Sequence, residues 1–144
     1  MIIIKKCGTT PEIIHALRPK EVFVFGSNLA GIHGAGAAYL AKKWGAFDGR
    51  GIGLSGQTYA IPTKDHAISS LSLGDILCHI EDFYSFAQAN PQLEFLVTKI
   101  GCGLAGYSVK DIAPLFFAEF LTLENISLPH EFIEIIIEKS EGES

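Results

Sequence analysis

The chain has 144 residues, of which 48% are hydrophobic and 19% charged, and its formal net charge is −5. This length and composition are typical of one domain with its own core, and they exclude disordered and collagen-like proteins. The negative charge argues against broad binding to duplex nucleic acid, and no apolar run approaches the roughly 20 residues that cross a bilayer, so we expect no membrane insertion.

Short runs rich in isoleucine, valine and phenylalanine predict five buried strands. In chain order they cover residues 2–5, 21–25, 58–61, 94–100 and 132–138. Helical patterns are predicted between them at residues 11–17, 36–44, 73–89 and 111–123, with Asp111 as the cap of the last helix. Strands that alternate with helices favour a three-layer α/β/α domain with a largely parallel sheet, which binds ligands at the carboxyl ends of its strands.

We expect a single domain over residues 1–139 and a disordered tail over residues 140–144. The glycine-rich stretch 47–57 is predicted to be a rim loop. Cys7, Cys78 and Cys102 are scattered, so they predict neither a disulfide framework nor a metal site. Without a signal-peptide pattern at the N-terminus, the protein is expected to be cytoplasmic and to need no metal or cofactor.

A first glycine-rich segment, Gly31-Ile-His-Gly-Ala-Gly-Ala-Ala38, follows a predicted strand and opens a predicted helix. Glycine has no Cβ, so the backbone can turn at positive φ and bring its N–H groups close to an anion. The predicted phosphate-binding residues are Gly31, Gly34, Ala35, Gly36 and Ala37. Asn28 is expected to hold a sugar hydroxyl. Glycines that serve only tight packing between strand and helix are the alternative interpretation.

His33 lies within this segment and is a candidate catalytic acid near neutral pH. A histidine that only bonds the backbone at the rim is the alternative. The other four histidines show no metal-ligand spacing.

A second glycine-rich segment follows another predicted strand, and two such loops can hold a diphosphate from both sides. Its predicted binding residues are Gly101, Cys102, Gly103, Leu104, Ala105, Gly106 and Tyr107. Tyr107 would stack on a sugar or form a wall of the cleft. The thiol of Cys102 is interpreted as a small buried group rather than as a nucleophile. The first segment lacks the G-x-G-x-x-G spacing of a dinucleotide fingerprint, and no Lys-Ser/Thr follows it as a P-loop requires.

Three motifs, Gly34-Ala-Gly36, Thr63-Lys64 and Ile100-Gly-Cys-Gly-Leu104, stand in the order found in the macrodomain family, which this chain resembles over residues 22–120. The likeness is closest to the branch that hydrolyses ADP-ribosyl-glutamate, and compact phage and bacterial proteins are similar. The resemblance implies a mixed, largely parallel sheet. It also implies binding of ADP-ribose, or a closely related nucleotide-sugar diphosphate, either free or attached to a macromolecule.

In that branch a lysine at the position of Lys64 attacks the anomeric carbon, and an acidic residue directly after Gly-Cys-Gly-Leu assists. Here the second position is Ala105, so ADP-ribosyl hydrolysis is a secondary hypothesis. Asp65 is the alternative acid, and Lys64 is alternatively a phosphate ligand or a solvated charge. The usual Gly-Asp-Ile/Leu turn, which recognises adenine, is replaced by Cys7-Gly-Thr-Thr10.

Two other functions stay open at this point. One is a phosphatase or hydrolase that acts on another nucleotide, such as ADP-ribose 1″-phosphate, with His33 or Asp65 and a bound water. The other is a non-enzymatic interaction module whose glycine loops serve packing alone.

Overall fold

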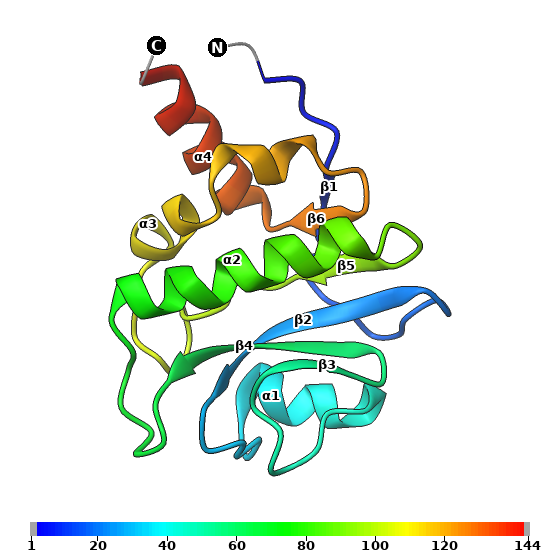
Figure 1. Ribbon diagram of the computed structural model, residues 1–144, viewed down its shortest axis with the longest axis vertical. Helices are drawn as coiled ribbons and strands as arrows, with labels where there is room; N and C mark the ends of the chain where they lie inside the picture. Colours follow the sequence, from blue (N-terminus) through cyan, green and yellow to red (C-terminus); the bar gives the residue numbers. More distant parts are fainter. Residues whose placement is uncertain (1–2, 143–144) are drawn as a thin grey trace.

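The computed structural model describes residues 3–142, and within them six strands form one sheet in the order β1-β6-β5-β2-β4-β3 (Figure 1). The strands are β1 Gly8–Thr9, β2 Glu21–Asn28, β3 Gly53–Ser55, β4 Thr58–Lys64, β5 Glu94–Val97 and β6 Ile126–Leu128. Neighbouring strands are parallel except β3 and β4, which are antiparallel. The expected mixed, largely parallel sheet is therefore confirmed.

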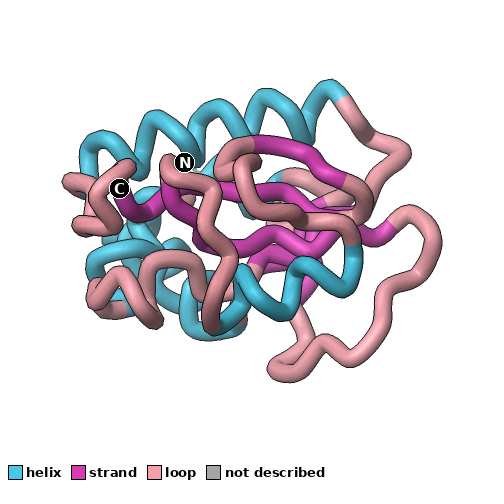
Figure 2. Tube along the Cα trace, turned by 90° about the horizontal axis from the view of Figure 1, so that it is seen from below, coloured by secondary structure: helices cyan, strands magenta, loops and turns pink. Residues whose placement is uncertain are grey.

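The helices cover both faces of this sheet (Figure 2). The α-helices are α1 Gly36–Ala41, α2 Leu73–Ala89, α3 Val109–Ile112 and α4 His130–Gly142, and the 3₁₀ helices are η1 Lys42–Trp44, η2 Ala113–Leu115 and η3 Ala118–Thr122. The predicted helix at 73–89 matches α2, and the one at 36–44 matches α1 together with η1.

Strand β2 shows how the layers arise, because successive side chains of a strand point to opposite faces. Val22 and Val24 belong to the large core cluster that includes the buried face of α2. Phe23 and Phe25 belong to a smaller cluster that includes Ala38 and Ala41 of α1. The helices α2 and α1 therefore lie on opposite faces of the sheet, and the three-layer α/β/α architecture is confirmed.

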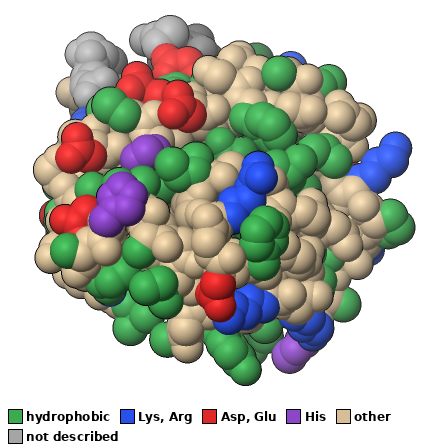
Figure 3. Space-filling model, turned by 60° about the horizontal axis from the view of Figure 1, so that its bottom comes forward, with side chains coloured by type: hydrophobic (Ala, Val, Ile, Leu, Met, Phe, Trp, Pro, Cys, Tyr) green, Lys and Arg blue, Asp and Glu red, His purple; other side chains and the backbone are tan. Residues whose placement is uncertain are grey.

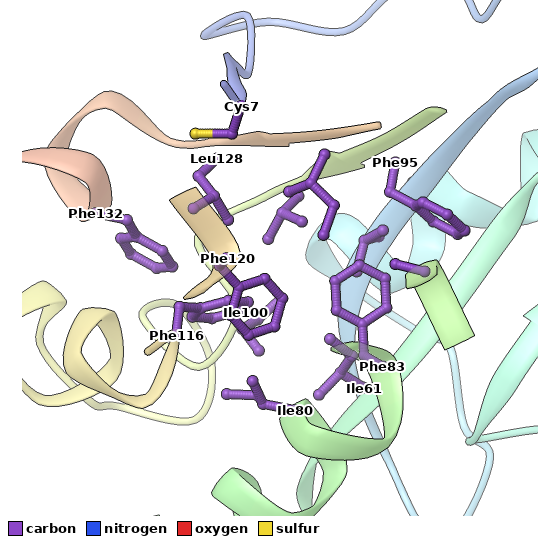
Figure 4. Packing of buried hydrophobic residues seen from close by; sticks show 14 of the residues in the cluster. Cys7, Ile61, Ile80, Phe83, Phe95, Ile100, Phe116, Phe120, Leu128 and Phe132 are labelled. Carbon is purple, nitrogen blue, oxygen red and sulfur yellow. The ribbon is translucent and has the colours of Figure 1, made fainter. Parts of the chain in front are cut away.

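The large core is built around phenylalanine rings (Figure 4). Phe83 of α2 lies edge-on to Phe95 of β5 and stacks on Phe120 of η3. Phe116 contacts both Phe120 and Phe132, the latter on α4. These contacts join α2, η3 and α4 into one packed layer.

Residues 132–138, predicted as a strand, are helical and belong to α4. The run of isoleucines at 135–137 suggested a strand, but the buried side chains are Phe132, Ile133 and Ile136, which share one helical face. The overlooked signal is Pro129 directly before the helix, with an acidic residue in its first turn. The helix also includes residues 140–142, where a tail was expected, while residues 143–144 lie outside the described residues.

Several other expected elements also differ from the structure. Residues 11–17 are not helical, because the β-branched Ile13 and Ile14 follow Pro11 and only Ile14 and Leu17 pack on the core. Residues 3–5 form no strand, and residue 2 lies outside the described residues. The rim stretch 47–57 contains β3, and the short strands β1 and β6 were not predicted.

The segment 111–123 is not one helix either. It divides into α3, η2 and η3, with Pro114 in the first turn of η2. Ser108 rather than Asp111 caps α3, and Asp111 completes a capping box with it.

Candidate functional site

A cavity of about 540 Å³ lies at the carboxyl ends of β2 and β4, between the two glycine-rich segments. Gly34, Ala35, Gly36 and Ala37 of the first segment line it. The second segment contributes Gly101, Gly103, Leu104 and Ala105. A Cβ on Gly36 would lie 3.7 Å from Leu104 Cδ1, so the two segments are direct neighbours. The structure therefore brings together two loops that are about 65 residues apart in the sequence.

Close backbone approach explains two of the glycines. A Cβ on Gly26, near the end of β2, would lie 3.3 Å from the amide nitrogen of Gly101. Gly101 itself has a φ of 74°, and a Cβ there would lie 2.8 Å from Ile112 Cδ1. A Cβ at Gly26 would crowd the backbone of the second segment, and Gly101 has a positive φ that favours glycine, so both glycines help this segment to lie against the end of β2.

Several backbone N–H groups around the cavity are available to an anion. Ala35 is the residue that precedes α1, and it offers no side-chain cap to the first turn of that helix. Within residues 3–142, the N–H groups of Gly34, Gly36, Gly101 and Gly103 donate to no protein acceptor. The cavity wall thus contains unpaired donors from both segments, which is the chemistry that a phosphate needs.

Two lysines give this wall its charge. Lys64, the last residue of β4, and Lys99, just after β5, both line the cavity. Among the described residues that line it, none is acidic. The site is therefore locally positive in a chain whose net charge is −5. The face that carries the loops after β2 and β4 shows basic side chains among uncharged surface, with most acidic side chains in view to one side (Figure 3).

Asn28 lines the cavity, but its side-chain amide holds the loop that follows β2. Its Nδ2 donates to Ile32 O at 2.7 Å, and its Oδ1 accepts from Ile32 N at 2.9 Å. Gly31 lies behind this loop, since a Cβ there would be 2.7 Å from the Gly49 carbonyl carbon. Gly31 is not a lining residue, so its role is packing rather than ligand contact.

His33 is fully buried and does not line the cavity. Its Nε2 lies 2.8 Å from Arg50 O, so this nitrogen carries the proton and donates. Its backbone N–H donates to Asp48 Oδ1 at 3.0 Å, and its ring lies edge-on to Phe25. His33 therefore fastens the first glycine segment to the stretch that follows it.

Asp65 lies outside the cavity lining, so it does not stand in for the missing acid. Its Oδ1 accepts from Ala67 N and Ser69 N, which closes the turn after β4. Ser70 in this turn donates to Ala105 O at 2.6 Å and so ties the turn to the second glycine segment. Ile68 of the same turn lines the cavity with a φ of 63°, an uncommon conformation for a β-branched residue.

Cys102, Gly106 and Tyr107 support the second segment from behind, and none of them lines the cavity. The hydroxyl of Tyr107 donates to Leu71 O, and its N–H donates to Gly101 O. Burial raises the pKa of the Cys102 thiol to about 11, so this group is protonated at neutral pH. The reading of Cys102 as a small packed thiol fits this environment.

A second cavity, of about 420 Å³, adjoins the first and was not found from the sequence. The two share Gly36, Ala37, Thr98 and Lys99 as lining residues. Most of the remaining wall is apolar and comes from Ile13, Ile14, Phe23, Leu40, Val97 and Pro129. Its residues come from the segment after β1, from β2, from α1, from the end of β5 and from the start of α4. No local motif marks such a cavity, because each part of the chain contributes only a few residues.

Within residues 3–142 no cluster of His, Cys, Asp or Glu could hold a metal ion. Over the same range, no helix is long and apolar enough to cross a membrane.

The chain resembles a known protein at the level of structure. No family model matches the sequence, and no curated protein matches it. Among solved structures, the chain is similar to the macrodomain of Mycobacterium tuberculosis DarG, with a TM-score of 0.61 and 18% sequence identity. The similarity covers 85% of this chain and 95% of that one. The chain therefore has the macrodomain fold, and the fold expected from the sequence motifs is confirmed.

Proposed function

We propose that this protein binds ADP-ribose or a closely related nucleotide-sugar diphosphate. The observation that carries the proposal is the pair of adjoining cavities, which meet at the start of α1 and at Thr98 and Lys99. One is mainly apolar and suits a planar base. The other is lined by backbone donors and two lysines and suits a diphosphate with a second sugar. The macrodomain fold supports the same ligand class.

The diphosphate is proposed to lie between Gly36 and Gly101, where both segments offer N–H groups that lack a protein acceptor. Each hydrogen bond to a charged phosphate contributes on the order of 1.5–3 kcal/mol. Distant acidic side chains have little effect on phosphate binding, because the Debye length is about 8 Å at physiological ionic strength. Local donors therefore outweigh the negative net charge of the chain.

The distal ribose is proposed to occupy the part of the larger cavity that Lys64 and Ile68 line. Asn28 supports this part indirectly. Its side-chain amide bonds both the N–H and the carbonyl of Ile32, and so holds the loop that follows β2. The ligand is either free ADP-ribose or ADP-ribose attached to a macromolecule. A cytoplasmic location fits the three cysteines, which are all free.

Calorimetric titration with ADP-ribose tests this function. Saturable binding is expected, and no heat at millimolar ligand would contradict the proposal. Gly103→Val is the sharpest variant, because a Cβ at Gly103 meets nothing within 4 Å and so leaves the fold intact. Its side chain would crowd the donors of the second segment, and we expect binding about tenfold weaker or worse.

Gly142→Val is the matched control, since a Cβ there also meets nothing within 4 Å and the residue is remote from both cavity linings. This control should bind as the unmodified protein does. Equal affinities for Gly103→Val and Gly142→Val would contradict the assigned place of the diphosphate.

Hydrolysis of an ADP-ribosyl adduct is a second candidate, favoured by the presence of Lys64 in the cavity wall. A lysine nucleophile needs a lowered pKa and a partner that moves protons. The described lining residues include no carboxylate, and Ala105 stands at the position of the usual acid. Binding is therefore the activity that the geometry supports best. A phosphatase that uses His33 or Asp65 is disfavoured, because both lie outside the cavity lining.

A further inference from the structure

Lys99 holds a particular place in the molecule, because it lines both cavities at the point where they meet. Its ammonium group forms an ion pair with the carboxylate of Glu131, in the first turn of α4. Glu131 lines the smaller cavity only. The pair therefore links the start of α4 to the junction where the proposed diphosphate would lie.

The pair is charged at neutral pH and is open to solvent. Hydrogen bonding to Glu131 raises the pKa of Lys99, and hydrogen bonding to Lys99 lowers the pKa of Glu131. The side chains are 42% and 38% exposed. Such exposed pairs contribute little to stability and break easily. The neighbouring carboxylate of Glu134 has its own partner, His130, at 2.8 Å.

We propose that Lys99 pairs with Glu131 when no ligand is bound, and that the Lys99 ammonium group leaves this carboxylate and binds a phosphate when a diphosphate ligand enters the junction of the two cavities. The inference rests on the proposed function and adds a residue that selects for phosphate. A phosphate group offers more negative charge and more acceptor oxygens than one carboxylate, so the exchange favours the ligand. The flexible stem and three donors of lysine allow it without movement of the backbone.

The exchange differs from simple attraction between Lys99 and the ligand in the expected effect of Glu131. Glu131 competes with the ligand for Lys99, so removing its charge should tighten binding. Glu131→Gln is expected to bind ADP-ribose about two- to fivefold more tightly, as the loss of an exposed ion pair would give. Lys99→Met is expected to bind it about tenfold more weakly or worse. In the Lys99→Met background, Glu131→Gln should bring no gain, because Lys99 is no longer there to be released.

Calorimetry with three probes tests the exchange in the full chain. ADP-ribose and inorganic pyrophosphate carry the diphosphate, whereas adenosine carries none. The pattern of the variants should appear with both diphosphates, and adenosine affinity should be the same in Lys99→Met as in the unmodified protein. Glu124→Gln is the matched control, because it removes the same charge from another exposed ion pair, that with Lys6, outside both cavity linings. Thermal unfolding midpoints of all variants should stay close together.

Two results would overturn the exchange. One is a gain from Glu131→Gln that persists in the Lys99→Met background or appears equally in Glu124→Gln, since the effect would then be long-range repulsion. The other is unchanged ADP-ribose affinity in Lys99→Met. Failure of the proposed function has a different signature, namely no binding of ADP-ribose to any variant. Pyrophosphate would in that case still report on Lys99 and Glu131.

Discussion

At the scale of single residues, the candidate site depends on backbone donors more than on side chains. Gly34 and Gly103 line the cavity with N–H groups that lack an acceptor in the described protein. The side chains first expected to contact the ligand mostly hold these loops in place, as Asn28 does through Ile32. This arrangement suits an anion, because fixed amides need no reorganisation when charge arrives.

Lys64 is a cationic residue of the larger cavity wall. Because no described acidic residue lines the cavity with it, we expect Lys64 to bind phosphate or ribose rather than to act as a nucleophile. Lys64→Ala should weaken ADP-ribose binding about tenfold, as the loss of one charge-assisted contact would.

Release of ADP-ribose from ADP-ribosyl-glutamate is the companion measurement, with Lys110→Ala as the control for loss of a positive charge outside both cavity linings. The unmodified protein should release ADP-ribose no faster than Lys64→Ala does. Turnover that Lys64→Ala abolishes and Lys110→Ala retains would instead establish hydrolysis through Lys64.

At the scale of elements, the first glycine segment is fastened to the stretch between α1 and β3. Asp48 is central to this, since its Oδ1 accepts from His33 N and its Oδ2 pairs with Lys42 at 3.1 Å. Ser27, near the end of β2, donates to Gly51 O, and Gly49 N donates to Gly31 O. The loop that supplies phosphate donors is therefore held by the segment expected to be a free rim.

Because of Asp48, the stability of these loop contacts should depend on pH. The hydrogen bond from His33 N–H, followed by that from Lys42, holds the pKa of Asp48 below its usual 3.8. A carboxylate with a lowered pKa in the folded state stabilises the fold above its ordinary pKa, and this contribution disappears as the pH falls through the folded-state value. The midpoint of thermal unfolding should therefore be lower for Asp48→Asn than for the unmodified protein at neutral pH.

The two midpoints should converge as the pH falls below 3.8. Asp75→Asn serves as the comparison, because Asp75 is in the first turn of α2, outside both cavity linings. A difference between Asp48→Asn and the unmodified protein that stays constant down to acidic pH would contradict this assignment of the charge.

At the scale of the whole molecule, the two faces of the sheet are packed unequally. The α2 face has a core of several phenylalanine and isoleucine side chains, including Phe83 and Ile80 (Figure 4). The α1 face relies on Phe23 and Phe25 against small alanines. Because less apolar surface is buried around α1, the part of the cavity wall that α1 contributes belongs to the less stable part of the fold.

Hydrogen exchange tests this asymmetry. Peptides that cover α1 should exchange faster than peptides that cover residues 76–87 of α2, because local opening of the small cluster requires less free energy. ADP-ribose should slow exchange in the first and second glycine segments and in α1, and leave α2 nearly unchanged. Equal protection of α1 and α2 in the absence of ligand would contradict the packing argument.

The glycine segments and the central strands could be predicted from the sequence because their signals are local. The apolar run of β2 and the helical period of α2 can each be read from one short stretch of sequence, and glycines after strands mark close backbone turns. The macrodomain fold was likewise foreseen from three short motifs. The strand prediction for residues 132–138 was wrong because a short isoleucine-rich run fits either a helix or a strand. Which of the two forms depends on which side chains the rest of the molecule buries.

The sequence by itself determined the class of fold and the two glycine-rich segments at one edge of the sheet. Only the tertiary structure decided that His33 is buried, that Asn28 bonds its own loop, and that a second cavity adjoins the first. It also decided that Lys99 pairs with Glu131. The reason is physical: local pattern controls backbone conformation, whereas burial, ion pairing and cavity shape arise from contacts between residues that are far apart in the chain.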